Sequence, residues 1–541
     1  MIEFKVNNIG YKLEDINPNT TVLDFMRHNL GIMDAKEGCA SGDCGACTVM
    51  VHKGHSQNQN SSFYTINACI TLLSLMHNQQ LFTSSYLAEN PTNHPEQAVL
   101  HPAQQAMVAC HGSQCGFCTP GFVMSLATLY QNRKSKNQLR LTENLYKEAS
   151  NKDRIHGSDI SEDEVISAIS GNLCRCTGYR PIVEAGKEMF RFEDTANVVD
   201  SLSVNELPTG LNRVQTVQTG DEIDKSSNVT DDEAPPALAK NDAKLYIPRS
   251  RPTLEKLLVS YPNAVLWAGG TDLGLTITQR FIDHKTIIQL SDVDELKQWS
   301  CQNDTLVLGA GMTYSQLQPV LEEYIPQFAK IIKRIASPQI RNMGTIGGNI
   351  ANASPIGDLP PILLALDAKI HIRHCASDPS NSNTNEDTSI KDTPLDQIMA
   401  LEDFFISYKQ TKLRAGSYIL AVHIPLLKDH QQLTVHKISK RYEDDISACL
   451  LALRIDLNQS ADKIVDARIG LGGMAEIPLL AKASQQKLVD SSISIDSFKA
   501  CSEALAKEVN PLSDVRASRE YRMKVIQRLI VQSGKQLLAS A

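Results

Sequence analysis

The 541-residue sequence lacks the features of a membrane, secreted or nucleic-acid-binding protein. No apolar run approaches the roughly 18 residues that span a bilayer, and the N-terminal MIEFKVNN has no basic-then-apolar signal pattern. Lys and Arg total 53 against 61 Asp and Glu, a formal net charge of -8, which argues against general nucleic-acid binding. We expect a cytoplasmic protein, in whose reducing compartment clustered cysteines more often bind metal or do redox work than form disulfides.

Cysteine is scarce beyond the N-terminal third. Of 13 cysteines, nine precede residue 177, and the later four are Cys301, Cys375, Cys449 and Cys501. We interpret these four, together with Cys110, as small buried residues. The chemistry of the thiols therefore belongs to the N-terminal third of a chain long enough for three or four domains.

The first cysteine set lies in the stretch GCASGDCGACTV (38–49). Cys39, Cys44 and Cys47 are spaced C-x4-C-x2-C, and Cys69 follows further along. This is the plant-type [2Fe–2S] ferredoxin spacing, and the interleaved glycines let backbone N–H groups approach the sulfurs. The alternative is a structural zinc site, but zinc sites usually pair two C-x2-C-like knuckles, which this spacing fits poorly.

The second set combines HGSQCGFCTPG with GNLCRCTGYRP. Cys115 and Cys118 precede a helix that we expect to open at Thr119-Pro120, and Cys174 and Cys176 follow a helix that we expect to end at Gly171. Two such loops could bring four thiols together for a second cluster, with zinc again as the alternative.

Composition divides the chain into five parts. Residues 1–85 predict a small β-rich domain with a hairpin and a helix capped by Thr21 and Asp24. Residues 86–195 predict a helical domain with a capping box at Ser161 and Glu164, and residues 196–243 an acidic linker. The remainder predicts an α/β domain over 244–424 and a final domain over 425–541. Polar stretches at 133–163 and 374–389 are expected to be insertions.

Two glycine-rich loops occur in the α/β part. LWAGGTDLG (266–274) follows a predicted strand, and TIGGNIANASPIGD (345–358) has a second Gly-Gly pair. Glycine turns let backbone N–H groups approach phosphate, so two such loops suggest a bound dinucleotide, although Gly-Gly is also an ordinary turn. GAGMTY (309–314) lacks the third glycine of a Rossmann fingerprint and is not interpreted as one.

Together, the cysteine loops, GNLCRCTGYRPI and TIGGNIANASPIGD resemble the iron–sulfur/FAD part of the xanthine dehydrogenase and molybdenum hydroxylase family. The resemblance covers nearly the whole chain and is closest to the small subunit of bacterial members. It implies a multidomain α+β fold: a β-grasp ferredoxin-like domain, a helical [2Fe–2S] domain, an FAD-binding domain of the vanillyl-alcohol-oxidase-like type, and a C-terminal α/β flavoprotein domain.

The resemblance also implies a role for particular residues. One cluster would be held by Cys39, Cys44, Cys47 and Cys69, and the other by Cys115, Cys118, Cys174 and Cys176. Contacts with FAD would come from Leu266, Ala268, Gly269, Gly270, Thr271, Asp272, Thr345, Gly348, Asn349, Asp358, Ile419 and Lys437. Gln114 would contact the pterin of the molybdenum cofactor in a partner subunit, and Tyr408 would lie near the NAD site. Asp444 and Asp445 would belong to the acidic loop that controls access of the acceptor to the flavin.

Two positions depart from the family pattern. Ile335 stands where the animal enzymes place a phenylalanine against the adenine, and Ala351 where they place an isoleucine over the flavin. The function implied is electron transfer from a molybdopterin site in a larger partner subunit, in a heterotetramer, through two clusters and FAD to NAD. The alternatives are the same module serving an aldehyde, CO or N-heterocycle hydroxylase, and a zinc-stabilised interaction protein with a nucleotide-binding domain.

Overall fold

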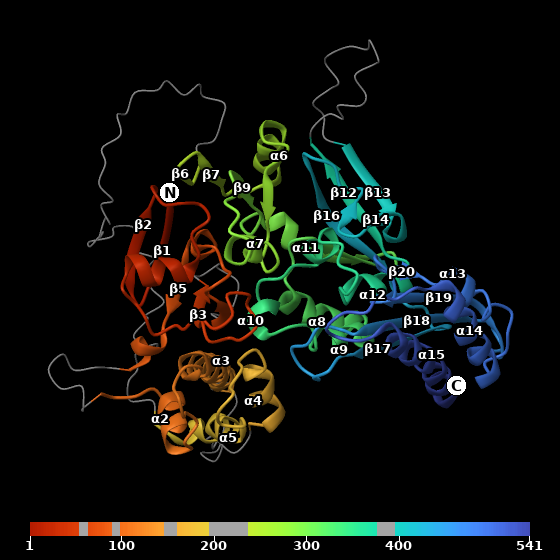
Figure 1. The fold of residues 1–541 in the computed structure, drawn as a ribbon, viewed down its shortest axis with the longest axis horizontal. Coiled ribbons are helices and arrows are strands. Elements are labelled where there is room, and N and C mark those ends of the chain that lie inside the picture. Colours follow the sequence, from red (N-terminus) through yellow and green to blue (C-terminus); the bar gives the residue numbers. More distant parts are fainter. Residues whose placement is uncertain (54–62, 89–97, 145–159, 194–235, 376–394, 541) are drawn as a thin grey trace, which may run out of the picture. The chain divides into compact units, whose positions relative to one another are not determined.

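The computed structural model describes residues 1–53, 63–88, 98–144, 160–193, 236–375 and 395–540, which form two compact units (Figure 1). Unit 1 comprises Met1–Ile247, Gly270–Gln289 and Ser337–Met343, and unit 2 comprises Pro248–Gly269, Leu290–Ala336 and Gly344–Ala541. Much of the predicted linker (196–243) and of the two predicted insertions (133–163 and 374–389) lies outside the described residues. None of the described helices combines the length and apolar character of a membrane span.

Unit 1 begins with a five-stranded sheet in the order β2-β1-β5-β3-β4. The strands are β1 (Ile2–Val6), β2 (Ile9–Leu13), β3 (Thr48–Lys53), β4 (Phe63–Asn67) and β5 (Gln79–Phe82). The predicted hairpin is confirmed, since β1 and β2 pair antiparallel. Strand β1 pairs parallel with β5, as in a β-grasp sheet. Alternate residues of β1 are buried, so one face of the sheet forms the core.

The predicted helix after Thr21 forms, but only its first turn is α-helical. Helix α1 (Val22–Asp24) continues as a π-helical turn, η1 (Phe25–Asn29). The Thr21 hydroxyl accepts a hydrogen bond from the Asp24 amide, which confirms the predicted cap.

The helical part of unit 1 (orange to yellow in Figure 1) packs around an apolar core that also contains Met50, Phe63 and Phe82 of the five-stranded sheet. Its helices are α2 (Pro102–Ala109), α3 (Thr119–Asn144), α4 (Glu162–Ile169) and α5 (Arg180–Glu188). The capping box at Ser161 and Glu164 is confirmed. Helix α3, however, runs on into the polar stretch that the sequence suggested to be an insertion. The part of this stretch that lies in α3, residues 133–144, contains no Gly or Pro, so nothing in it stops the helix.

Two later segments of the chain also belong to unit 1. They contain α7 (Gly274–Thr278) with β9 (Thr286–Gln289), and α10 (Pro338–Arg341). Strand β9 pairs parallel with β7 (Ala243–Tyr246), which pairs antiparallel with β6 (Leu238–Lys240).

The described residues of unit 2 form two larger antiparallel sheets and the two-stranded antiparallel pair of β14 and β15. The first has the order β10-β11-β16-β12-β13. Its strands are β10 (Trp299–Gln302), β11 (Thr305–Gly309), β12 (Lys369–His374), β13 (Leu395–Ala400) and β16 (Ser417–Pro425). Five helices of this part are α6 (Arg251–Ser260), α8 (Tyr314–Tyr324), α9 (Pro326–Ile332), α11 (Ile346–Ala351) and α12 (Leu359–Ala365). Shorter strands are β8 (Val265–Trp267), β14 (Phe405–Ser407) and β15 (Gln410–Thr411).

The second sheet of unit 2 has the order β17-β18-β19-β20 (Figure 1). Its strands are β17 (Gln431–Ile438), β18 (Cys449–Leu457), β19 (Ile464–Gly472) and β20 (Leu479–Leu480), with helices α13 (Lys482–Gln485), α14 (Ile495–Glu508) and α15 (Arg519–Ser540). Cys375, Cys449 and Cys501 are buried as expected, whereas Cys110 and Cys301 are half-buried.

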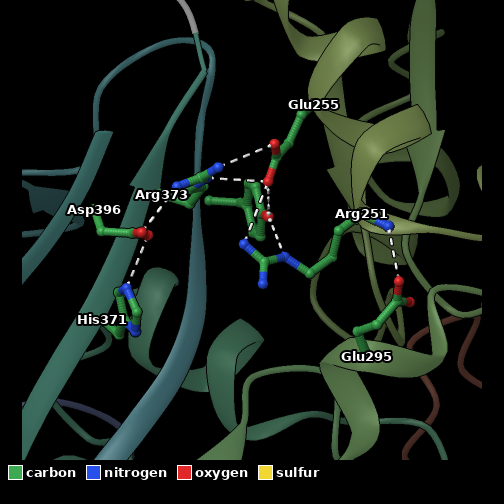
Figure 2. A network of polar contacts seen from close by, with 7 residues as sticks. Arg251, Glu255, Glu295, His371, Arg373 and Asp396 are labelled. Carbon is green, nitrogen blue, oxygen red and sulfur yellow. Dashed lines mark hydrogen bonds and ion pairs between the residues drawn. The ribbon is translucent and has the colours of Figure 1, made fainter. Parts of the chain in front are cut away.

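A polar network holds α6 against the first sheet of unit 2 (Figure 2). Glu255 of α6 accepts hydrogen bonds from Arg373 of β12, with Nε–Oε1 3.0 Å, and from the Tyr418 hydroxyl of β16 at 3.1 Å. Arg373 also donates to Asp396 of β13 at 2.8 Å, and Asp396 contacts His371 at 2.9 Å. The side chains of Glu255 and Arg373 are only 14% and 17% exposed. The network thus fixes the helix that leads into β8 and the first glycine loop.

We predict that Glu255→Gln lowers the free energy of unfolding by roughly 2 kcal/mol, because Arg373 and Arg251 then face a neutral amide in a poorly solvated position. The measurement is the urea dependence of far-UV circular dichroism. Asp294→Asn is the matched control, since Asp294 pairs with Lys297 but its side chain is 84% exposed. That control should change stability by less than about 0.5 kcal/mol. Equal effects of the two substitutions would contradict the prediction.

Candidate cofactor sites

The first cysteine set is gathered beside β3 and β4. Hydrogen bonds from Cys44 and Cys69 lower the pKa of the Cys39 thiol, and contact with Cys39 raises the pKa of both partners. Cys69 also contacts Cys47, so all four sulfurs form one connected group. All the cysteines are free. The set therefore offers four neighbouring thiols, which lose protons on metal binding.

The backbone of this loop is wound so that N–H groups point at sulfur. The amides of Ser41 and Cys44 each lie 3.4 Å from Cys39 Sγ. Gly42 has φ +78°, and a Cβ there would lie 2.6 Å from Ile70 Cδ1, so only glycine fits. Asn67 donates to the Gly42 carbonyl at 2.8 Å and fixes the turn. Such N–H donors stabilise the negative charge of an iron–sulfur cluster.

The second cysteine set joins the α2–α3 loop to the α4–α5 loop. Cys176 Sγ and Cys115 Sγ lie 3.7 Å apart, and both residues are exposed. Burial and contact with Cys174 raise the pKa of Cys118 to about 12. Burial raises the pKa of Cys174, but hydrogen bonds from Thr177 outweigh it and lower that pKa overall. The structure therefore brings these four predicted residues together as two sulfur pairs, one of them at the surface.

The two cysteine loops touch through the backbone. The amide of Leu173, next to Cys174, donates to the carbonyl of Cys44 at 2.9 Å. The buried side chain of Asn172 donates to the Gly45 carbonyl at 2.9 Å. The sequence reasoning missed Asn172, because an asparagine after a helix-ending glycine is also an ordinary turn residue.

A [2Fe–2S] cluster spreads its four thiolates over two irons, whereas zinc gathers its ligands tetrahedrally around one point. The connected sulfurs and the N–H groups aimed at Cys39 and Cys174 fit the first arrangement.

The second glycine loop caps α11. The Thr345 hydroxyl accepts from the Gly348 amide at 3.1 Å. Apart from that hydroxyl and helix α11 itself, no described atom lies within 4 Å of a Cβ placed at Gly348. The Asn349 Oδ1 atom is buried and has no hydrogen-bond partner among the described residues. An open cradle beside an unsatisfied buried acceptor fits a polar ligand such as the dinucleotide of FAD.

Asp358 and Lys437, both predicted to contact FAD, form a buried ion pair. Lys437 Nζ lies 2.7 Å from Asp358 Oδ2, and their side chains are 1% and 8% exposed. Lys437 also donates to the Arg334 carbonyl at 2.9 Å, and the Ser447 hydroxyl donates to Asp358 Oδ1. The pair thus joins α12 to β17, and each charge is largely satisfied within the protein.

The first glycine loop follows β8. Leu266, Ala268 and Gly269 belong to unit 2, and Gly270, Thr271 and Asp272 to unit 1. Asp272 is exposed, and the other five are half-buried. Gly270 has φ +70°, and its carbonyl accepts from the Gly274 amide at 2.6 Å, so the loop turns directly into α7.

The remaining predicted residues lie apart from these groups. Ile419 is buried in the core of unit 2, whereas Tyr408 lies exposed in the turn between β14 and β15. Gln114 is exposed beside Cys115. Their predicted contacts with flavin, NAD and pterin stay predictions.

The structure also describes the loop of Asp444 and Asp445 and the two positions that depart from the family pattern, Ile335 and Ala351. Asp444 has φ +46°, and Asp445 accepts from the Arg441 amide at 2.9 Å. Ile335 is buried in the same core as Ile419, and Ala351 packs against that core.

Four family models match the chain in succession. They are "2Fe-2S iron-sulfur cluster binding domain" (residues 4–74), "[2Fe-2S] binding domain" (88–187), "FAD binding domain in molybdopterin dehydrogenase" (241–382) and "CO dehydrogenase flavoprotein C-terminal domain" (434–536). The first two enclose the two cysteine sets, and the third encloses both glycine loops.

Curated relatives extend the match over almost the whole chain. Xanthine dehydrogenase 1 of Arabidopsis thaliana is 28% identical over 93% of this chain, and xanthine dehydrogenase/oxidase of Gallus gallus is 27% identical over 90%. The chain spans 37% and 36% of the length of these relatives. These matches support an iron–sulfur and FAD module of the molybdenum hydroxylase type.

Solved structures similar to this chain cover about half of it. CO dehydrogenase from Oligotropha carboxidovorans is 24% identical with a TM-score of 0.48, covering 55% of this chain and 98% of its own. Quinoline 2-oxidoreductase from Pseudomonas putida 86 is 23% identical with a TM-score of 0.47, and the same shares are covered.

We predict that Cys69→Ser halves the iron of the purified chain, from about four atoms per chain to about two, because one cluster loses a ligand. Iron and labile sulfide assays measure this. Cys110→Ser is the matched control, because Cys110 lies near the second set but belongs to neither group. Full iron in the Cys69 variant, or an equal loss in the control, would sink the ligand assignment.

Proposed function

We propose that this chain is the electron-transfer subunit of a xanthine dehydrogenase that converts hypoxanthine and xanthine to urate. Electrons would pass from a molybdenum site in a larger partner subunit through the two [2Fe–2S] clusters to FAD and on to NAD. One observation carries the proposal: the two cysteine sets are in direct contact, through the hydrogen bond from the Leu173 amide to the Cys44 carbonyl. They occur in a chain that also matches an FAD-binding domain.

The cofactors would supply the redox chemistry, and the side chains would hold and tune them. Cys39, Cys44, Cys47 and Cys69 would hold one cluster, and Cys115, Cys118, Cys174 and Cys176 the other. The donors on Cys39 and Cys174 would stabilise the charge of the thiolates. Asn349 and the Gly348 cradle would bind and orient FAD. The Asp358–Lys437 pair would fix the loop that ends at Asp358.

Xanthine is favoured by the curated relatives, which are xanthine dehydrogenases and match this chain over about nine tenths of its length. The second candidate is the same module in a hydroxylase for CO, an aldehyde or an N-heterocycle. The C-terminal match to a CO dehydrogenase flavoprotein domain favours that alternative. The third, a zinc-stabilised interaction protein, requires zinc without sulfide or flavin.

The partner is proposed to be a large molybdopterin-binding subunit, in a heterotetramer of two small and two large chains. The exposed pair Cys115 and Cys176 and the exposed side chain of Gln114 offer the surface near which the pterin would lie. Contact with the partner would shield this cluster from water.

We predict that the anaerobically purified full chain contains about four irons, about four sulfides and one FAD, with no zinc, because both sets bind [2Fe–2S] clusters. Metal analysis, a sulfide assay and the absorbance of released flavin measure this. The chain should also reduce a dye with NADH, which tests NAD as the acceptor. Stoichiometric zinc without sulfide or flavin would leave the interaction-protein alternative.

The substrate is tested on the complex purified with its native partner. Urate formation from xanthine, compared with turnover of CO, an aldehyde and quinoline under the same conditions, separates the two hydroxylase candidates. Turnover of one of the other substrates without urate formation would replace xanthine dehydrogenase by that hydroxylase and leave the electron-transfer role standing.

A further inference from the structure

Helix α7, which begins at Gly274, the last residue of the first glycine loop, lies on the first cysteine loop within unit 1. The hydroxyl of Thr278 donates to the Ala40 carbonyl at 2.7 Å. The side-chain amide of Gln279 donates, through Nε2, to the carbonyls of Cys39 and Ala40 at 3.1 and 3.0 Å. Two side chains from the FAD-binding part of the sequence thus hold the backbone of a proposed cluster ligand.

The same helix also reaches the other end of the cysteine set. A Cβ at Gly274 would lie 2.5 Å from the carbonyl of Ile70, the residue after Cys69. Only glycine allows the helix to lie so close. Helix α7 therefore touches the chain next to Cys39 and next to Cys69, which the sequence places 30 residues apart.

The conformation of Ala40 indicates that these contacts hold the loop against strain. Ala40 has φ +51°, a region that residues other than glycine rarely adopt and that persists when surrounding contacts over-determine it. Its carbonyl accepts from both Thr278 and Gln279. The Cys39 sulfur, just before Ala40 in the chain, accepts hydrogen bonds from the backbone amides of Ser41 and Cys44, which follow it. Without the hydrogen bonds from Thr278 and Gln279, the loop would relax and the amides of Ser41 and Cys44 would move.

We propose that Thr278 and Gln279 are positioning residues for the first cluster, which hold the Cys39–Ala40 backbone and thereby set the reduction potential of that cluster. The role rests on the proposed function, because it assumes that Cys39 is a cluster ligand. The two donors place positive partial charge on carbonyls beside a group that becomes more negative on reduction. Removing a donor should therefore lower the midpoint potential.

The test uses the full chain with both clusters and FAD, carrying Thr278→Val, which keeps the shape of the side chain but loses the hydroxyl. Redox titration followed by electron paramagnetic resonance (EPR) spectroscopy measures each cluster separately, with Cys69→Ser and Cys176→Ser variants identifying the two signals. We expect the potential of the first cluster to fall and its EPR line shape to change, while the second signal stays. Thr278→Ser should restore both properties, and Gln279→Met should repeat the shift.

Asn19→Ala is the matched control. Asn19 makes two hydrogen bonds with the backbone of His284, at 2.9 and 3.1 Å, in the same segment of unit 1 but away from the cysteine loop. This variant should lose a comparable number of hydrogen bonds between the N-terminal sheet region and the 270–289 segment, and it should leave both EPR signals unchanged. Thr278→Val and Gln279→Met variants with wild-type signals, or a control with the same shift, would overturn the positioning role.

Iron counts keep the two proposals distinguishable. A wild-type chain without two clusters would overturn the proposed function itself. A wild-type chain with full iron, and variants with full iron and unmoved signals, would overturn only the role of Thr278 and Gln279. The positioning role would be supported if Thr278→Val lost the first cluster alone while Thr278→Ser and Asn19→Ala kept it.

Discussion

The carbonyl of Gly45 is the point on which the arrangement of both cysteine loops depends. It accepts hydrogen bonds from the Thr48 amide at 3.1 Å, the Thr48 hydroxyl at 2.6 Å and the Asn172 side chain at 2.9 Å. A Cβ at Gly121 would lie 2.2 Å from this oxygen, and a Cβ at Gly45 would lie 2.1 Å from the Gly171 carbonyl. Withdrawal of the helical part would remove the Asn172 donor from this buried carbonyl and leave it with the two donors of Thr48. It would also break the close approach of Gly121 and Gly171 to the loop. The contact between Leu173 and Cys44 follows from this junction.

The features that could be predicted from the sequence are local. The cysteine spacing depends on a loop of a few residues, the cap at Ser161 on a partner three residues away, and the β1–β2 hairpin on neighbouring strands. Each is decided by contacts that a short window of sequence contains. The order of the four domains came from the family resemblance, and the four family matches confirm it.

The features that could not be predicted are contacts between distant segments. Gln339 donates to the Thr48 hydroxyl at 3.0 Å across 291 residues, and Thr278 reaches Ala40 across 238. A glutamine or threonine in a short helix carries no local sign of such a partner. Helix α3 also extends further than the sequence indicated, because it continues to Asn144 in a polar stretch that we expected to lie between two helices.

The buried pair of Asp358 and Lys437 shows why predicting a site residue differs from predicting its role. Both residues were expected to contact flavin, but each has its charge paired with the other. Burying two charges costs desolvation energy that their attraction repays only partly, so the pair adds little net stability. Removing one partner would instead leave an unpaired charge in the core, which is costly. The pair therefore constrains geometry: β17 cannot shift relative to the N-terminus of α12 without separating the charges. Any ligand bound beside Asp358 meets a neutral, rigid wall rather than a free carboxylate, and its charge must be matched by the backbone and amide groups of the glycine loop.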